Sequence, residues 1–212
     1  VTYSQVTASM SDYIAAEYSD IFHQAKVNFD ERRELVKVVG DSIGRRMDQL
    51  VLDALGAASS PSTVATGIGG STSNMNLAKL LAAKKALDTK NVPADGRCMI
   101  IHANGLSSLL DEQELTSSDF ASVKALVQGE IDTFLGFKFI TLGDRDEGGL
   151  PIPSTRTNYA FHRDAIGLGV SMAQKTEINY VPEKTSFLVS SMFSAGAVSI
   201  DDDGIVVISS TE

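Results

Sequence analysis

Residues 30–56 read DERRELVKVVGDSIGRRMDQLVLDALG, and this stretch predicts one long helix. Its apolar residues recur every three or four positions, which places them in one stripe along a helix; they are Leu35, Val39, Ile43, Met47, Leu50 and Ala54. Asp30 is the predicted N-cap, and Gly56 is the predicted stop. A helix of this length would be a rod of roughly 39 Å, which is long for a chain of 212 residues.

The segment after this helix, residues 57–74, is a run of small residues, AASSPSTVATGIGGSTSN. It has neither the G-x-x-x-x-G-K-[ST] nor the G-x-G-x-x-G spacing of a phosphate-binding loop, and it follows a helix instead of a strand. We therefore expect a connection that binds no nucleotide and ends in a helix cap at Ser73 or Asn74. The next predicted helix, residues 76–91, is expected to turn its lysines outward and to use as its apolar residues Leu77, Leu80, Leu81 and Leu87.

Beyond a turn at residues 92–96 the pattern changes to alternating strands and helices, so the predicted fold class is α+β. The expected elements are a strand at 97–102, helices at 105–115 and 119–131, a strand at 137–143, an exposed loop at 144–158, a strand or turn at 159–170, a connection at 173–184 and a long strand at 185–200. No internal repeat is visible in the sequence.

Three adjacent carboxylates, Asp201, Asp202 and Asp203, stand before a glycine and an apolar run near the end of the chain. A calcium loop of the EF-hand type needs oxygens at alternating positions and a Glu at about the twelfth, and this stretch has neither. Asp and Gly are turn residues, and the flanking segments carry the β-branched residues that strands favour. The sequence therefore favours a turn between two strands of a terminal hairpin over a metal site.

Composition limits the classes of protein to consider. The chain is 43% hydrophobic and 21% charged with a net charge of −9, and its basic residues are scattered, which disfavours a general nucleic-acid binder. It has no apolar run long enough for a membrane helix and no signal-peptide pattern at its start. The one cysteine, Cys98, fits a reducing cytosol. Because the sequence begins at Val1 and not at Met, we expect a processed product or a fragment.

Enzymatic interpretations have few candidate residues. The three histidines, His23, His102 and His162, are each isolated from any partner at metal-ligand spacing. A triad of Ser107, His102 and Asp111 would fall within about ten residues and lacks the G-x-S-x-G turn, and Cys98 has no evident relay. Pairs such as Glu112 and Glu114 are typical of a solvated face. We therefore predict no catalytic residue, no metal and no cofactor.

Four stretches, in their order, carry a resemblance to a known family: the helix of residues 30–56; residues 76–112, with a helix, the NVP turn, a strand and a helix; residues 134–144, FLGFKFITLGD; and residues 187–208, FLVSSMFSAGAVSIDDDGIVVI. Together they resemble the major capsid protein of tailed bacteriophages, which has the Hong Kong 97-like fold. The likeness runs from Asp30 to the C-terminus.

This resemblance implies a long spine helix, a peripheral domain and an axial domain that points to the centre of the capsomer. It assigns residues 1–27 to the end of an extended loop, residues 28–72 and 186–212 to the peripheral domain, and residues 73–185 to the axial domain. The family's N-terminal arm and the first half of its extended loop are absent from this sequence. The stretch at Asp201–Gly204 would be the tip of a hairpin that closes the peripheral sheet.

The function implied by the resemblance is structural. The chain would self-assemble into pentamers and hexamers of an icosahedral phage head, built in the bacterial cytoplasm, that encloses double-stranded DNA without sequence-specific binding. Scaffold or decoration proteins would be further partners. The alternatives are an encapsulin-like compartment that encloses protein and, from a different class, a small cytosolic α+β hydrolase that uses Ser107 or Cys98.

The resemblance also places the charged loop DRDEGGLPIPSTR, residues 144–156, near the symmetry axis of the capsomer. Five or six copies of this loop would converge there, and its acidic residues would repel their symmetry mates unless an arginine of a neighbouring copy pairs with them. The expected subunit-interface residues are Asp144, Arg145, Asp146, Glu147 and Arg156.

Overall fold

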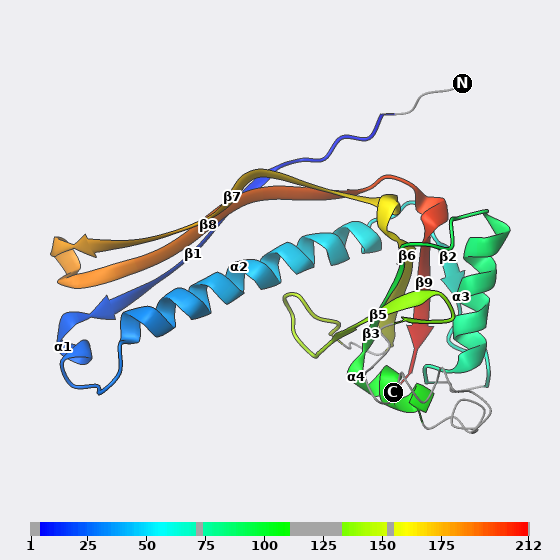
Figure 1. The fold of residues 1–212 in the computed structure, drawn as a ribbon, viewed down its shortest axis with the longest axis horizontal. Helices are drawn as coiled ribbons and strands as arrows, with labels where there is room; N and C mark the ends of the chain where they lie inside the picture. Colours follow the sequence, from blue (N-terminus) through cyan, green and yellow to red (C-terminus); the bar gives the residue numbers. More distant parts are fainter. Residues whose placement is uncertain (1–4, 71–73, 111–132, 152–154, 212) are drawn as a thin grey trace. The chain divides into compact units, whose positions relative to one another are not determined.

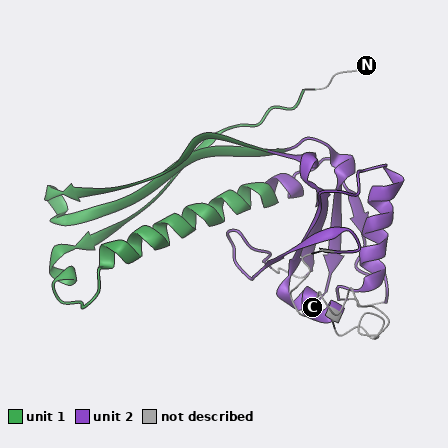
Figure 2. Cartoon of the chain, in the orientation of Figure 1, with its two compact units in different colours: residues 1–52, 168–198 green, residues 53–167, 199–212 purple. Residues whose placement is uncertain are grey.

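The structure, a computed structural model, describes residues 5–70, 74–110, 133–151 and 155–211 (Figure 1). It contains helices together with a three-stranded and a six-stranded sheet, so the α+β class is confirmed. The chain forms two compact units (Figure 2). Unit 1 holds residues 1–52 and 168–198, and unit 2 holds residues 53–167 and 199–212. These limits differ from the peripheral and axial ranges expected above, and that assignment of domains stays a prediction.

Unit 1 contains a sheet of three long strands in the order β1-β8-β7. The strands are β1 (Ser11–Asp20), β7 (Ile166–Val181) and β8 (Ser186–Ser199), with a short turn of 3-10 helix, Pro182–Lys184, between β7 and β8. β1 pairs antiparallel with β8, and Tyr13 lies opposite Phe193. The connection expected at residues 173–184 is wrong, because most of it belongs to β7. The strand begins with an apolar alternation of Ile166, Leu168, Val170 and Met172, but the polar residues 174–177 interrupt it, so the second half of the strand has no clear strand pattern.

The long helix α2 runs from Glu31 to Gly56, as its apolar period predicts. Ile43, from the predicted stripe, is 2% exposed and packs with Phe193 and Ala195 of β8. The partly buried side chains around this cluster are Tyr13, Ala15, Met47 and Leu50. The stripe of α2 therefore covers one face of the three-stranded sheet in unit 1, and the short helix α1 (Ile21–Gln24) precedes it.

Unit 2 is built on the six-stranded sheet, in the order β2-β9-β6-β3-β5-β4. Its strands are β2 (Ser62–Val64), β3 (Arg97–His102), β4 (Thr133–Phe134), β5 (Phe137–Leu142), β6 (Arg156–His162) and β9 (Ile205–Ser210). The pairs β2–β9 and β3–β5 are parallel, and the others are antiparallel. The helices are α3 (Leu77–Thr89) and α4 (Ala103–Leu110). The expected helix at 119–131 lies outside the described residues.

The apolar face of α3 differs from the expected one. Leu80 and Leu87 are buried in the core of unit 2, whereas Leu81 is 48% exposed. Lys79, expected to point outward, is fully buried, and its Nζ donates a hydrogen bond to the carbonyl oxygen of Asn74 (3.1 Å). This burial lowers the pKa of Lys79.

The N-cap of α3 is neither of the residues expected. Asn76 caps the helix, because its side-chain oxygen accepts a hydrogen bond from the amide of Lys79 (2.9 Å). Asn74 lies two positions earlier, and Ser73 lies outside the described residues.

The terminal hairpin predicted around residues 201–204 is also wrong. β8 belongs to the three-stranded sheet, whereas β9 lies in the six-stranded sheet between β2 and β6. The stretch between them holds a 3-10 turn, η3 (Asp202–Gly204), at which the chain passes from one sheet to the other. Asp and Gly suit this change of sheet as well as they suit a hairpin turn, so the local pattern could not distinguish the two.

Candidate assembly surfaces

In unit 2, the first part of the charged loop, residues 144–150, is closed by backbone hydrogen bonds to Gly143, the residue before it. The carbonyl oxygen of Gly143 accepts hydrogen bonds from the amides of Arg145 and Leu150, both at 3.1 Å. A Cβ at Gly149 would lie 2.6 Å from the carbonyl oxygens of Gly143 and Arg145, so only glycine fits this position. Leu150 is 4% exposed and anchors the end of the loop. These contacts therefore hold the two ends of the segment close together.

Arg156, the first residue of β6, contacts both ends of this segment. Its side chain is 1% exposed, its Nη1 lies 2.8 Å from Oδ1 of Asp144, and it donates a hydrogen bond to the carbonyl oxygen of Leu150. His102, which is 5% exposed, places its Nε2 3.6 Å from the same Asp144 oxygen. The hydrogen bond from Arg156, and more weakly its charge and that of His102, lower the pKa of Asp144.

The structure thus changes the set of expected interface residues. Arg156 is not an exposed side chain awaiting a neighbouring copy, because it lies inside its own subunit and pairs there with Asp144. Asp144, Arg145, Asp146 and Glu147 are exposed and consecutive in the loop, as their composition predicts. They remain the candidate contact residues of this surface, with Arg145 as their adjacent cation.

The acidic triplet at the start of η3 has a structural role for each carboxylate. Asp201 accepts a hydrogen bond from the amide of Asp203 (3.0 Å) and so caps the turn. Asp202 accepts one from the amide of Ser60 (3.0 Å), and Asp203 pairs with Nζ of Lys90 (2.6 Å). Because the three carboxylates bind three different partners, they do not converge on one point. Across the described ranges, no group of three or more His, Cys, Asp or Glu side chains could hold a metal ion.

The residues considered for hydrolysis have structural contacts. The Nδ1 of His102 accepts a hydrogen bond from the amide of Asn104 (3.2 Å) in the first turn of α4. Ser107 is exposed on α4, and Asp111, the third member of the triad that the sequence disfavours, lies outside the described residues. Cys98 is half-buried in β3, and burial raises the pKa of its thiol, which disfavours the reactive thiolate.

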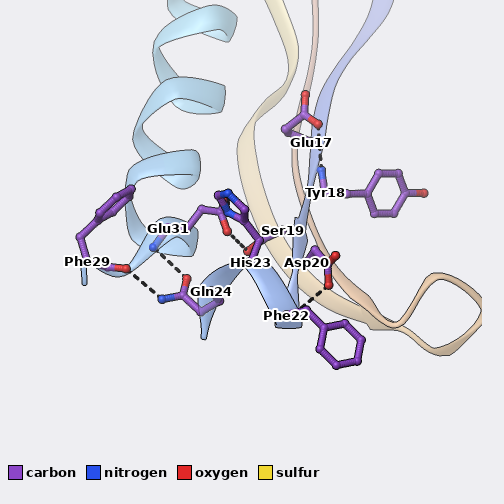
Figure 3. Close-up of polar contacts among 9 residues, drawn as sticks. All are labelled: Glu17, Tyr18, Ser19, Asp20, Phe22, His23, Gln24, Phe29 and Glu31. Atoms are coloured by element: carbon purple, nitrogen blue, oxygen red, sulfur yellow. Dashed lines mark hydrogen bonds and ion pairs between the residues drawn. The ribbon is translucent and has the colours of Figure 1, made fainter. Parts of the chain in front are cut away.

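A second surface, which the sequence analysis did not identify, lies at the turn between β1 and α2 (Figure 3). The side chain of Gln24 bridges this turn, since it donates to the carbonyl oxygen of Phe29 and accepts from the amide of Glu31, both at 2.9 Å. Glu31 in turn accepts from Ser19 Oγ (2.9 Å) and lies 3.3 Å from Nδ1 of His23. These contacts define the path of the turn.

Two aromatic side chains stand on this turn and point away from its polar contacts (Figure 3). Phe22 is 68% exposed and Phe29 is 58% exposed. Exposed aromatic residues on a well-held turn are typical of contact surfaces. The segment before the long helix, IFHQAKVNFD at residues 21–30, mixes apolar and polar residues, so its letters do not mark these two phenylalanines as exposed.

Comparison with solved structures shows what this fold resembles. A structure from Mycobacterium phage Che8 superposes with a TM-score of 0.74 at 20% identity, covering 93% of this chain and 70% of that one. The capsid structure of the cyanophage P-SCSP1u gives 0.74 at 14% identity and covers 100% and 80%. The acid-stable capsid of Helicobacter pylori bacteriophage KHP30 gives 0.73 at 11% identity and covers 96% and 76%. These likenesses show the fold, which agrees with the one that the sequence resemblance implies.

The sequence itself matches a family profile, although no curated protein matches the chain. Within the described ranges, no helix is both long enough and apolar enough to cross a membrane. The profile of the family described as "Phage capsid protein" matches residues 1–212. Because this match extends over the whole sequence, the chain belongs to the phage capsid protein family.

Proposed function

We propose that this protein is the major capsid subunit of a tailed phage and that it assembles with copies of itself, as pentamers and hexamers, into a closed head around double-stranded DNA. The observation that carries the proposal is the family match over residues 1–212. The capsid structures with the same fold support it. The hydrolase and the protein-filled compartment have no comparable support.

The architecture of unit 1 suits repeated contacts between identical subunits. Its sheet ends in two long edge strands, β1 with 10 residues and β7 with 16. Edge strands and exposed apolar side chains are liabilities in a monomer, but they provide contact surface in a symmetric assembly. We assign unit 1 to the peripheral domain and unit 2, with its charged loop, to the axial domain.

No chemistry is required of the chain in this role. We infer that it is not an enzyme and that it holds DNA by enclosure, because its net charge of −9 and its scattered cations do not favour binding to phosphates. The head would assemble in the bacterial cytoplasm, and the mature protein would be located in the virion. Scaffold or decoration proteins would be the remaining partners.

Electron microscopy of the purified full-length protein tests this function. We expect closed shells of uniform size, with pentameric and hexameric capsomers. Particles from infected cells should contain double-stranded DNA that is protected from added nuclease. A protein that stays monomeric at all concentrations would contradict the proposal, and shells filled with a protein cargo but free of DNA would favour the compartment.

The charged loop provides a more local prediction. Arg145→Glu should lower the yield of shells from the full-length protein, most strongly at low salt, because five or six copies of an all-acidic loop would then converge. The melting temperature of the subunit should hardly change, since exposed ion pairs contribute about 0 to 1 kcal/mol. Lys85→Glu, on the exposed face of α3, makes the same change in net charge and serves as the control. A normal yield at low ionic strength would place this loop away from the axis.

A further inference from the structure

The chain that precedes β1 leaves the three-stranded sheet at a glycine. Pairing between β1 and β8 ends at Ser11 and Ala195, and the next residue of β8 is Gly196. A Cβ at Gly196 would overlap the carbonyl oxygen of Ser9, and it would lie 2.9 Å from the carbonyl carbon of Ser9 and 3.4 Å from Cα of Met10. Gly196 is itself buried. The backbone of residues 9–10 therefore rests directly on the bare backbone of β8.

A second glycine continues this path onto the neighbouring strand. Gly169 lies in β7, and a Cβ there would be 2.5 Å from Cε of Met10 and 3.7 Å from the carbonyl oxygen of Gly196. Two glycines in adjacent strands thus lie beneath two consecutive residues of the segment. In Figure 1 this segment reaches the long strands where β1 begins.

Both glycines lie on the sheet face that α2 does not cover. Ala195 packs with Ile43 of α2, so its neighbour Gly196 faces the other way. On β7, Nε2 of Gln174 reaches the carbonyl oxygen of Gly40 in α2 (3.5 Å), and Gly169, five positions away, lies on the opposite face. The two glycines therefore leave β8 and β7 without a side chain at neighbouring positions on this face.

We propose that Gly169 and Gly196 form a saddle that fixes the path of the segment before β1. With a side chain at position 196, Ser9 could not occupy its place, and the segment would have to leave the sheet in another direction. The saddle holds residues 9–10 against the uncovered face, where Met10 is 48% exposed, and Val6, farther from β1, is 47% exposed.

The second part of the proposal rests on the proposed function. In a capsid subunit the segment before β1 is the end of the extended loop, and its partner is a second copy of this chain. The direction in which it leaves the sheet then decides which neighbouring surface it reaches. The saddle is thus a positioning device for a contact between subunits, and it makes little contribution to the fold of its own subunit.

Spin labels test the path in the unassembled full-length subunit. One label replaces Val6, the other replaces the exposed Lys37 of α2, and Cys98→Ser removes the native thiol. We expect one narrow distance distribution between the labels, and Gly196→Ala should shift or broaden it. Gly169→Ala should have a smaller effect, because its Cβ meets only the flexible end of Met10.

The matched control is Gly44→Ala in α2, where an added Cβ meets nothing within 4 Å, and it should leave the distribution unchanged. A broad distribution in the unsubstituted subunit would overturn the saddle without depending on any glycine variant. An unchanged distribution in Gly196→Ala would overturn it as well.

Assembly of the same variants tests the second part. Gly196→Ala should lower the yield of shells at least several-fold, while Gly44→Ala should assemble like the parent protein. Normal assembly of Gly196→Ala with a shifted label distance would overturn the role of the saddle in contacts between subunits. A parent protein that forms no shells would overturn the proposed function and leave the saddle to be decided by the label distances.

Discussion

Phe193→Ala is expected to lower the free energy of unfolding by about 3–5 kcal/mol, the usual cost of removing a buried aromatic side chain. Phe193 is 0% exposed, and its ring stacks on that of Tyr13 with centroids 5.1 Å apart. It also packs against Ile43 of α2, so its loss would open a cavity between the helix and the sheet of unit 1. Denaturant unfolding followed by circular dichroism measures the change.

Phe22→Ala is the control for this change, because the same side chain is removed from a position that is 68% exposed. Its effect on unfolding should stay within about 0.5 kcal/mol. A Phe193→Ala subunit that unfolds at the parent denaturant concentration would show that α2 does not pack on this sheet as described. The loss of about 3–5 kcal/mol expected for Phe193→Ala is a large part of the roughly 5–15 kcal/mol that stabilises a typical domain.

The sequence predicted α2 well because the signal for a helix is local. The apolar stripe follows from spacings of three and four residues, and Ile43 indeed lies in the core of unit 1. The second half of β7, residues 173–181, carries no such signal, because it belongs to an edge strand and its mostly exposed side chains include a polar run at 174–177. The prediction of a hairpin at residues 201–204 was wrong for a different reason. Which strand pairs with β9 depends on contacts with β2 and β6, which the letters near the turn do not contain.

The exposure of charged residues also depends on contacts with distant segments, which a local sequence pattern does not contain. Composition correctly predicted that the residues from Asp144 to Glu147 are exposed in a loop. It also suggested exposure for Lys79 and Arg156, and both are buried. Their burial depends on carbonyl oxygens of Asn74 and Leu150, whose positions are set by the surrounding fold. Each of these buried cations has a backbone carbonyl as a partner, and Arg156 also has the carboxylate of Asp144; no local residue pattern identifies these partners.

Some of the candidate surfaces could be predicted from the sequence and others only from the structure. The charged loop could be found from its letters, whereas the turn between β1 and α2 and the glycine saddle could not. Gly196 looks like any glycine in a strand until the carbonyl group of Ser9, from the other end of the chain, is placed on it. A glycine that permits close approach of another segment is visible only when both segments are in place.

Arg156→Glu is expected to destabilise the subunit by about 3–5 kcal/mol, in contrast to the small effect that an exposed arginine would have. The new carboxylate would take the place of a side chain that is 1% exposed, would face Asp144, and would leave the carbonyl oxygen of Leu150 without its donor. Arg156→Met should cost less, because Asp144 is 62% exposed and water can solvate it once its partner is gone.

The pH dependence of stability provides an independent measurement of this pair. The pKa of Asp144 is lower in the folded subunit than its ordinary value of about 3.9, so the ionised form is favoured by folding. The resulting stabilisation is fully present above the ordinary pKa and is lost as the pH falls through the lower folded value. The difference in melting temperature between the parent subunit and Arg156→Met should therefore shrink as the pH is lowered below about 4. A difference that does not change with pH would exclude the ion pair as its source.

Arg145→Glu completes the comparison, because it makes the same reversal of charge at an exposed position in the loop that Arg156, the first residue of β6, contacts. The two variants should affect different properties. Arg156→Glu should lower the melting temperature of the subunit itself. Arg145→Glu should keep the parent melting temperature but give a lower yield of shells at low salt. If Arg156→Glu instead kept the parent melting temperature, Arg156 would be an exposed residue available to a neighbouring copy. Burial therefore decides which of two arginines in one loop region supports the fold and which is available for assembly.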